Sequence, residues 1–337
     1  MPITSFPFGV QGAPLIGGRL VETFQSTFAA NPKDPLGSNI YFVDGDNGND
    51  KQDGHSPDTC MKTIGAALAV SQPGAVIFIK PRKIAAGGTD PVSYAEKLTI
   101  GPSQAGTCLI GCGPGRDQTA QPQLKASLGA GSLLTIQAPG CLIYGLTFNG
   151  AGTTTKGITL DDNGTTKVAS GTTIDNCVFK NCKGTGVTDS STGGAINIAS
   201  TGGAWDCWIK NCLFYKNIGG IVLLGTSQVQ PQDWIVENCQ FATDVATDVD
   251  TYIWGKAGSG FIDLIIRNCS FGFFPSGNTK NTFMDLTSCT GQLIGCRFAS
   301  SGKTFGAAGN VLIPTTVLMA DNYQESAAGA SGIIGRT

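Results

Sequence analysis

Charge is scarce in this sequence. Asp, Glu, Lys and Arg make up 14% of the 337 residues, against about a quarter in an ordinary soluble domain. The formal net charge of −2 provides no basic surface for nucleic acid or for an anionic membrane. A disordered chain would also contain fewer large apolar residues than the 41% hydrophobic content found here. We therefore expect a folded domain without a nucleic-acid partner.

Long apolar runs and targeting patterns are missing too. No stretch approaches 18 consecutive apolar residues, which predicts no membrane insertion. Residues 1–10 lack a basic segment followed by an apolar one, so we predict no signal peptide. Without secretion, the 12 Cys favour reduced thiols over a disulfide framework. One His and no CxxC pair leave no zinc pattern, and we expect no metal and no cofactor.

A short phrase recurs along the chain. Its clearest copy reads Ile-Asp-Asn-Cys-Val-Phe over residues 174–179, and further copies begin at Ile209, Val236, Ile266 and Leu293. The equivalent aromatic residues are 25 to 35 positions apart, a spacing typical of one solenoid coil. A second short apolar run precedes each copy, and no helical pattern separates the two. Strands that repeat in this way stack in parallel, which predicts a parallel β-helix.

The phrase predicts columns inside and at the corners of the solenoid. Side chains alternate along a strand, so Ile, Cys and Phe are expected to face inward, with Cys as a small apolar residue and without a catalytic role. Asn tolerates the left-handed conformation of a sharp corner, where Gly145 and Gly295 replace it in two copies. The predicted columns are Cys177, Cys212, Cys239, Cys269 and Cys296; Phe148, Phe179, Phe214, Phe241, Phe271 and Phe298; and Asn176, Asn211, Asn238 and Asn268. The outward residues beside the Asn alternate in sign: Asp175, Lys210, Glu237 and Arg267.

The two ends differ from the repeat. Residues 60–71 predict a helix, capped by Asp58 or Thr59, over the N-terminal mouth of the solenoid, because a solenoid needs its raw edges covered. Residues 1–38 are rich in Pro, Gly and Phe; 19–30 fit a short helix, and the segment either docks on a partner or packs on its own solenoid. We divide the chain into an anchoring arm (1–38), a β-helix (39–323) that includes a capping segment (39–75), and a C-terminal tail (324–337).

The start of the β-helix carries a resemblance to known proteins. Residues 41–50 (Tyr-Phe-Val-Asp-Gly-Asp-Asn-Gly-Asn-Asp), followed by Asp53-Gly54 and by Thr-Ile-Gly-Ala-Ala over 63–67, resemble the entry motif of the pectate-lyase-like right-handed β-helix superfamily. The resemblance implies an all-β chain, a single-stranded right-handed parallel β-helix with a short N-terminal capping helix. It also implies a range of functions, because the superfamily includes polysaccharide lyases and hydrolases, surface adhesins, and bacteriophage tailspikes and head spikes. Its phage spikes imply a homotrimer.

Few residues suit catalysis on this fold. Of the polygalacturonase-like motifs, the chain has only Asp161-Asp162, and adjacent strand residues point to opposite faces, so this pair is a weak carboxylate candidate. Asp244, Asp248 and Asp250 cluster in one short segment. Because hard cations bind oxygen ligands, this segment is either a cation-binding loop or simply a solvated loop. Aromatic candidates for stacking on sugar rings, or for covering the flanks of the solenoid, are Trp205, Trp208, Trp234, Trp254 and Tyr215.

Three classes of function stay open. The first is a virion structural or attachment protein, assembled in the host cytoplasm and bound to other virion proteins through residues 1–38, with host surface polysaccharide as a ligand. The second is a polysaccharide lyase or glycoside hydrolase, and the third is a surface adhesin. The missing enzyme motifs and the missing signal peptide favour the first.

Overall fold

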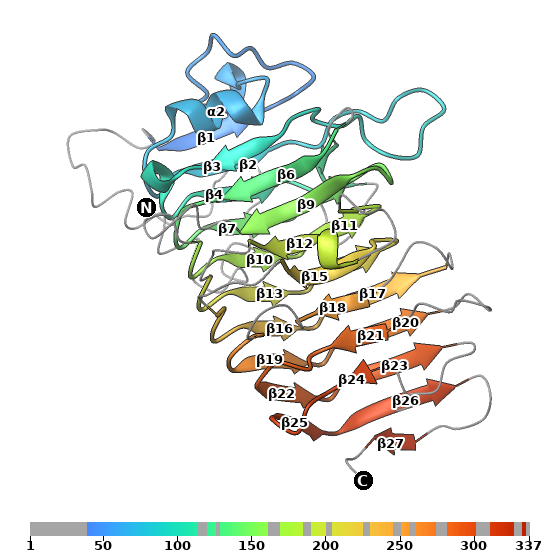
Figure 1. Ribbon diagram of the computed structural model, residues 1–337. Coiled ribbons are helices and arrows are strands. Elements are labelled where there is room, and N and C mark those ends of the chain that lie inside the picture. Colours follow the sequence, from blue (N-terminus) through green and yellow to red (C-terminus); the bar gives the residue numbers. More distant parts are fainter. Residues whose placement is uncertain are drawn as a thin grey trace, which may run out of the picture.

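The chain winds into a tube whose wall consists of three sheets (Figure 1). The computed structural model describes residues 39–113, 120–125, 129–160, 169–184, 190–199, 204–224, 230–244, 251–255, 260–273, 282–300, 311–326 and 332–334. From β4 to β24 each coil contributes one strand to each sheet, and successive coils stack from the blue N-terminal end to the red C-terminal end (Figure 1). The prediction of an all-β parallel β-helix is confirmed.

Sheet 1 is the longest of the three. In stacking order its strands are β1 (Ile40–Val43), β2 (Val76–Ile79), β4 (Cys108–Gly111), β7 (Leu142–Tyr144), β10 (Thr173–Asp175), β13 (Trp208–Lys210), β16 (Ile235–Glu237), β19 (Leu264–Arg267), β22 (Gly291–Ile294) and β25 (Val317–Ala320). All neighbours in this sheet are parallel. The register aligns the repeated phrase with itself, so that Ile143, Ile174, Ile209, Val236 and Ile266 form one inward column.

Sheets 2 and 3 complete each coil. Sheet 2 contains β5 (Gln123–Leu124), β8 (Thr147–Asn149), β11 (Val178–Lys180), β14 (Leu213–Tyr215), β17 (Gln240–Thr243), β20 (Ser270–Phe273), β23 (Arg297–Ser300), β26 (Asn322–Ser326) and β27 (Gly332–Ile334). Sheet 3 contains β3 (Leu98–Ile100), β6 (Gly131–Ile136), β9 (Thr155–Leu160), β12 (Ile196–Ile198), β15 (Gly219–Leu223), β18 (Thr251–Trp254), β21 (Thr282–Asp285) and β24 (Val311–Leu312). Three 3₁₀ turns, η2 (Pro57–Thr59), η3 (Pro102–Gln104) and η4 (Ser190–Thr192), lie between strands.

A stack of aromatic rings fills one side of the interior. The six Phe side chains from Phe148 to Phe298 are at most 1% exposed. Successive ring centroids lie 4.4 to 5.1 Å apart, and their planes are within 11° of parallel. The rings follow the strand spacing of about 4.8 Å, so each coil rests on the ring of the coil before it.

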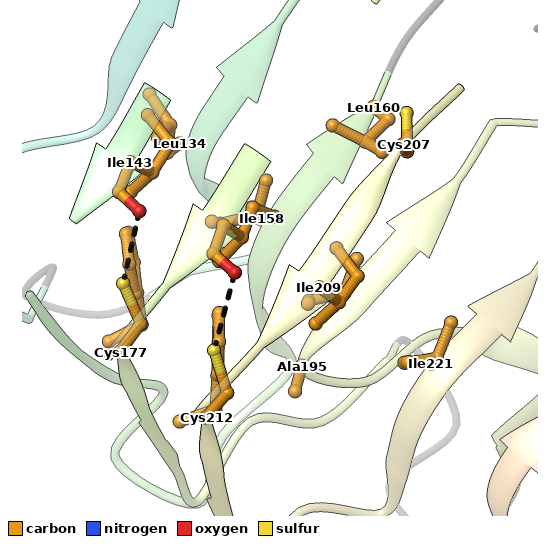
Figure 2. Packing of buried hydrophobic residues seen from close by; sticks show 14 of the residues in the cluster. Leu134, Ile143, Ile158, Leu160, Cys177, Ala195, Cys207, Ile209, Cys212 and Ile221 are labelled. Atoms are coloured by element: carbon orange, nitrogen blue, oxygen red, sulfur yellow. Dashed lines mark hydrogen bonds between the residues drawn. The ribbon is translucent and has the colours of Figure 1, made fainter. Parts of the chain in front are cut away.

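A file of thiols runs beside the rings. The five Cys side chains are buried, and each thiol lies within hydrogen-bonding distance of two backbone carbonyls, one in the preceding coil and a closer one two residues earlier in its own coil. Figure 2 shows the thiol of Cys177 directed at the carbonyl oxygen of Ile143, 3.6 Å away. The thiols are therefore weak hydrogen-bond donors as well as small apolar groups, which composition alone does not reveal.

The Asn residues occupy the corner between sheets 1 and 2. Asn176, Asn211, Asn238 and Asn268 have φ between 53° and 55°, and Gly145 and Gly295 have φ of 67° and 62°. At each corner the backbone N–H donates to a carbonyl of the next coil, as Asn176 does to Lys210. A left-handed residue thus turns the chain without breaking the ladder between coils.

A second left-handed corner, before sheet 1, was not predicted. Gly140 and Gly171 occupy it in two coils, and Asp206, Asp233 and Asp263 occupy it in the next three, with φ between 51° and 70°. Short polar side chains adopt this conformation almost as readily as glycine. Because Gly occupies this corner in some coils and Asp in others, no single residue type in the sequence indicates it.

The capping helix α2 (Ile64–Val70) lies at the N-terminal end of the tube (Figure 1). Ile64, Ala67 and Leu68 pack into the interior cluster. The predicted N-cap was wrong, because Thr63 caps the helix and its side chain accepts from the N–H of Ala66. The helix begins later than predicted since the N–H of Met61 pairs with Phe42 at the edge of sheet 1.

The last strands extend the tube beyond the predicted boundary at residue 324. β26 runs to Ser326 and continues the parallel stack of sheet 2. β27 then pairs with β26 in antiparallel register. This hairpin covers the terminal edge of sheet 2, an edge that a solenoid must protect.

Candidate functional site

Several predicted site residues lie outside the described part of the chain. These are Asp161, Asp162, Asp248 and Asp250, together with residues 1–38. Asp244 is described, and its carboxylate lies 3.0 Å from the ammonium of Lys216. This hydrogen bond holds the pKa of Asp244 below its ordinary value. Asp244 thus pairs with a lysine of the preceding coil.

The outward charges of sheet 1 also pair between coils. The ammonium of Lys210 lies 3.6 Å from the carboxylate of Asp175. The guanidinium of Arg267 contacts the carboxylate of Glu237 at 2.5 Å. These partners stand in direct register on neighbouring strands, where opposite charges each contribute about 0.2–1 kcal/mol. Their role is to hold coils together.

Beside these charges runs a column of half-buried apolar side chains. Trp208, Ile235 and Ile265 are neighbours on β13, β16 and β19. The ammonium of Lys210 lies 3.8 Å from the centroid of the Trp208 ring, a favourable cation–π arrangement. We name this surface the flank stripe; it comprises Trp208, Lys210, Ile235, Glu237, Ile265 and Arg267. It combines apolar area with charge on a flat sheet.

The aromatic candidates do not form one surface. Trp205, at the corner before β13, is 37% exposed, and its indole N–H donates to the carbonyl of Gln230. Trp254 and Tyr215 are half-buried. Trp234 was predicted wrongly as a candidate for an exposed aromatic, because it is fully buried and its N–H donates to the carbonyl of Ala204. Trp234 lies two residues before the inward Val236, so strand alternation directs both side chains into the tube.

A buried polar cluster lies on the outer face of sheet 2 near the N-terminal end. The amide of Asn149 donates to the side-chain oxygen of Gln123 at 2.7 Å. The hydroxyl of Thr147 donates to the side-chain oxygen of Gln121 at 3.2 Å. All four residues are at most 6% exposed. They form a network of hydrogen bonds between β5, β8 and the residues just before β5.

A lysine and a carboxylate complete this cluster. The ammonium of Lys180 on β11, a neighbour of Asn149, lies 2.5 Å from the carboxylate of Asp90. Asp90 lies four residues before Tyr94, which pairs in parallel with Leu124 at the N-terminal edge of sheet 2. Among the described residues, the side-chain nitrogen of Gln123 has no hydrogen-bond partner. Amides, an ammonium and a carboxylate are groups that bind sugar hydroxyls and can move protons.

The interior thiols are chemically quiet. Burial raises the pKa of Cys182 and of Cys207 to about 12, so both stay protonated near neutral pH. A reactive thiol needs the thiolate and access to solvent, and these two have neither. In the described ranges, no group of three or more His, Cys, Asp or Glu side chains is placed to hold a metal ion, and no helix there is long and apolar enough to cross a membrane.

Comparison with known proteins gives a structural likeness without a sequence match. No model of a protein family matches the chain, and no curated protein matches it. YbhC of Escherichia coli superposes with a TM-score of 0.51 at 10% identity, over 87% of this chain and 86% of YbhC. Pectate lyase Pel9A gives 0.47 at 16% identity, over 85% of this chain and 76% of its own. ORF18 of Geobacillus virus E2 gives 0.42 at 15% identity, over 75% of this chain and 53% of its own.

The stacked parallel sheets together with this likeness decide the fold. This chain is a right-handed parallel β-helix. At such low identity the likeness concerns the fold alone, and the function has to come from the site.

The sequence patterns did not indicate the polar cluster of sheet 2. Its members come from four separate segments of the chain, and none of them belongs to a carboxylate pair with the spacing of a known motif. The cluster could have been recognised from the residue that follows each Phe of the repeat. This residue is the polar Asn149 after Phe148 and Lys180 after Phe179, whereas later coils have Ala242 and Gly272 at the same position. Outward positions that depart from the repeat are where such a β-helix places its individual chemistry.

Proposed function

We propose that this protein is a structural attachment subunit of a virion. In this role the β-helix is a stiff projecting body, and residues 1–38 join it to other virion proteins. One observation carries the proposal: rings, thiols and strand ladders continue without a break from coil to coil along the interior. A stack in which every coil rests on the previous one resists bending and unwinding.

The use of the carboxylates supports the same role. Asp44, Asp46, Asp90, Asp175, Glu237 and Asp244 are each in contact with a lysine or arginine of another segment. Carboxylates in such pairs serve cohesion. We further propose a homotrimer, by analogy with the phage spikes that the sequence resembles, since symmetric homo-oligomers are the common assembly of soluble proteins.

The ligand in this proposal is a host surface polysaccharide bound on the flank stripe. The ring of Trp208 offers an apolar face for sugar rings, and Lys210 and Glu237 offer charges for hydroxyl and acidic groups. Trp208→Ala is expected to weaken binding to capsular polysaccharide at least tenfold. Tyr323→Ala, which removes an exposed aromatic on the last coil outside the stripe, is the control. Equal loss in both variants contradicts the stripe as the binding surface.

Particle assembly tests the attachment role itself. A chain that lacks residues 1–38 is expected to produce a folded β-helix, seen by circular dichroism, that does not enter particles. The intact chain is expected to be visible as a projection on purified particles by electron microscopy. Incorporation of the truncated chain would show that residues 1–38 are not the connection.

The alternative is cleavage of a polysaccharide, and the polar cluster of sheet 2 favours it. The contact between Lys180 and Asp90 beside the unpartnered amide of Gln123 places a proton donor and acceptor next to hydrogen-bonding groups. If this site is catalytic, purified protein releases oligosaccharides, and Asp90→Asn abolishes the release. The control is Asp46→Asn, which changes a carboxylate that pairs with Arg82 outside the cluster. This variant is expected to keep full activity.

A further inference from the structure

A groove of about 250 Å³ lies between the capping helix α2 and the start of β3. The two elements are neighbours at the blue N-terminal end of the tube (Figure 1). One side is lined by Gly65, Leu68 and Ala69, and the other by Lys97, Leu98 and Thr99. Sites for small molecules usually measure about 300–1,000 Å³. The groove is therefore small for such a ligand and suits a short stretch of polypeptide.

Hydrogen bonds hold the helix and the strand at this separation. The carboxylate of Glu96, which comes before β3, accepts from the N–H groups of Ile64 and Gly65 at 3.0 and 2.7 Å. The side-chain amide of Gln104, which comes after β3, donates to the carbonyl of Leu68. Contacts on both sides of the strand thus tie it to α2, so the groove is preformed.

One edge of β3 is open along this groove. β3 is the first strand of sheet 3 and, among the described strands, it pairs with β6 alone. The N–H of Gln137 donates to the carbonyl of Ile100, and successive residues of a strand direct their N–H and C=O groups to opposite sides. Leu98 and Ile100 therefore bond to β6. Lys97 and Thr99 direct their backbone groups to the other side, where α2 and the groove lie.

We propose that this groove binds an extended segment of a partner protein, which adds to β3 as a further strand. An edge strand offers unpaired N–H and C=O groups to an extended chain, and strand addition is a recurring mode of peptide recognition. Lys97 and Thr99 are about 6.6 Å apart along the strand, which equals the repeat of such groups in a bound strand. An extended polypeptide therefore pairs with both residues at once.

The side chains around the groove define the chemistry of the segment. Leu68 and Leu98 provide apolar surface for alternate side chains of a bound strand. The ammonium of Lys97 donates to the carbonyls of Gly129 and Ala130 at 3.3 and 2.8 Å. In the described ranges, no acidic side chain forms an ion pair with it. We expect a segment with apolar residues at alternate positions and an acidic residue opposite Lys97.

This inference does not rest on the proposed attachment role. The groove lies beside sheet 3, whereas the flank stripe lies on sheet 1. Loss of polysaccharide binding or of particle incorporation does not affect the groove, and loss of peptide binding does not affect the stripe. Each proposal therefore has a readout that the other does not change.

Peptide selection on the full chain tests the proposal. Random heptapeptides displayed on filamentous phage are selected for binding, and enriched sequences are synthesised with a fluorescent label for measurement by fluorescence anisotropy. We expect enriched peptides to have alternating apolar residues and at least one acidic residue. N-methylation of every second backbone nitrogen is expected to weaken binding at least tenfold in one of the two frames and not in the other, because only one set of N–H groups faces β3.

Two pairs of variants locate the binding surface. Thr99→Pro removes one edge N–H, and proline is tolerated on an edge strand where that group faces away from the ladder. This variant is expected to weaken binding at least tenfold, whereas Thr99→Ala keeps the N–H and is the matched control. Ala69→Trp fills the groove and is expected to abolish binding. Val70→Trp changes an exposed neighbour that does not line the groove and is expected to leave binding unchanged.

Four results would overturn the proposal. One is a selection that enriches no peptide, and another is enriched peptides that bind Thr99→Pro and Ala69→Trp as tightly as the parent. The third is peptide binding by a chain that lacks residues 1–38 but not by the full chain, which assigns the groove to a segment of the same chain. The fourth is a dimer of the full chain that dissociates in Ala69→Trp, which assigns it to a second copy. If Thr99→Pro does not fold by circular dichroism, Ala69→Trp and the N-methylated peptides decide.

Discussion

The ring stack predicts that its middle is the most sensitive part of the interior. Phe241 lies between Phe214 and Phe271, with ring centroids 4.4 and 4.8 Å away, and is fully buried. Removal of a buried Phe ring costs about 3–5 kcal/mol. Strand ladders hold both neighbouring rings in place, so the cavity cannot close, and we expect Phe241→Ala near the upper end. Each stacked pair contributes about 0.5–1.5 kcal/mol beyond area burial, and two pairs are lost.

Two variants make this expectation specific. Phe148 stacks on Phe179 on one side and is paired with Leu124 in the coil on the other, so Phe148→Ala loses one stacked pair and should cost about 1 kcal/mol less. Leu318→Ala, at the exposed end of sheet 1, should stay within about 0.5 kcal/mol of the parent. The free energy of unfolding is measured in urea by circular dichroism, and hydrogen exchange of coil peptides locates the loss, because solenoids can unfold in parts. A cost for Phe241→Ala no greater than for Leu318→Ala would show that the stacked rings do not stabilise the β-helix.

The remaining predictions concern the entry loop, a corner and the thiol file. Burial alone would raise the pKa of Asp44, but hydrogen bonds from Lys80 and from neighbouring N–H groups outweigh it and lower the pKa from 3.8 to about 2. The charged carboxylate therefore contributes about 2 kcal/mol to stability above pH 4, and this contribution is lost as the pH falls toward 2. Asp44→Asn should make the free energy of unfolding less dependent on pH between 4 and 2, and an unchanged pH dependence contradicts the assignment. At the corner between sheets 1 and 2, Asn238 has a φ of 53°. Asn238→Ala should lower the free energy of unfolding by about 1–2 kcal/mol, and Asn238→Gly by less than half of that, as measured in thermal melts. Equal losses in the two variants would exclude backbone strain as the cause. In the thiol file, the sulfur of Cys212 lies 3.2 Å from the carbonyl oxygen of Lys210 and 3.7 Å from that of Ile174. Cys212→Ala should cost about 1–2 kcal/mol through the cavity and the lost hydrogen bond. Cys212→Ser should keep a hydrogen bond and give a smaller loss of stability in urea, and the reverse order would contradict the donor role of the thiol.

The interior was predictable because it repeats. Coils of a β-helix are in register, so a residue such as Phe214 meets the same residue in the coils above and below. One short phrase therefore specified the strand alternation, the ring column and the corner at Asn211 together. The start of α2 at Ile64 was not predictable in this way. It depends on Met61 pairing with sheet 1, a contact distant from anything in the local helix pattern.

The outer faces were less predictable, for a related reason. An inward position is fixed by identical neighbours, whereas an outward one is fixed by whatever segment crosses it. Lys180 is 6% exposed and contacts Asp90 of a non-repeating segment, and nothing in the phrase around Phe179 indicates that contact. Trp234 is a different case, because it shares the inward alternation of Val236 and its burial follows from the strand pattern. The contacts that decide the outer faces are made by non-repeating segments.

It follows that function in this β-helix should be sought where the outward columns change character. The columns of sheet 1 change between β7 and β10, from Tyr144 to Asp175, and below that boundary the charges pair between coils. On sheet 2 the polar cluster gives way between β11 and β17, where Lys180 is followed in its column by Tyr215 and then by Ala242. The change on sheet 1 comes before the coil of β10 and β11, and the change on sheet 2 comes after it. The inward residues continue through both boundaries, so it is only the outward residues that distinguish these coils from the rest of the stack.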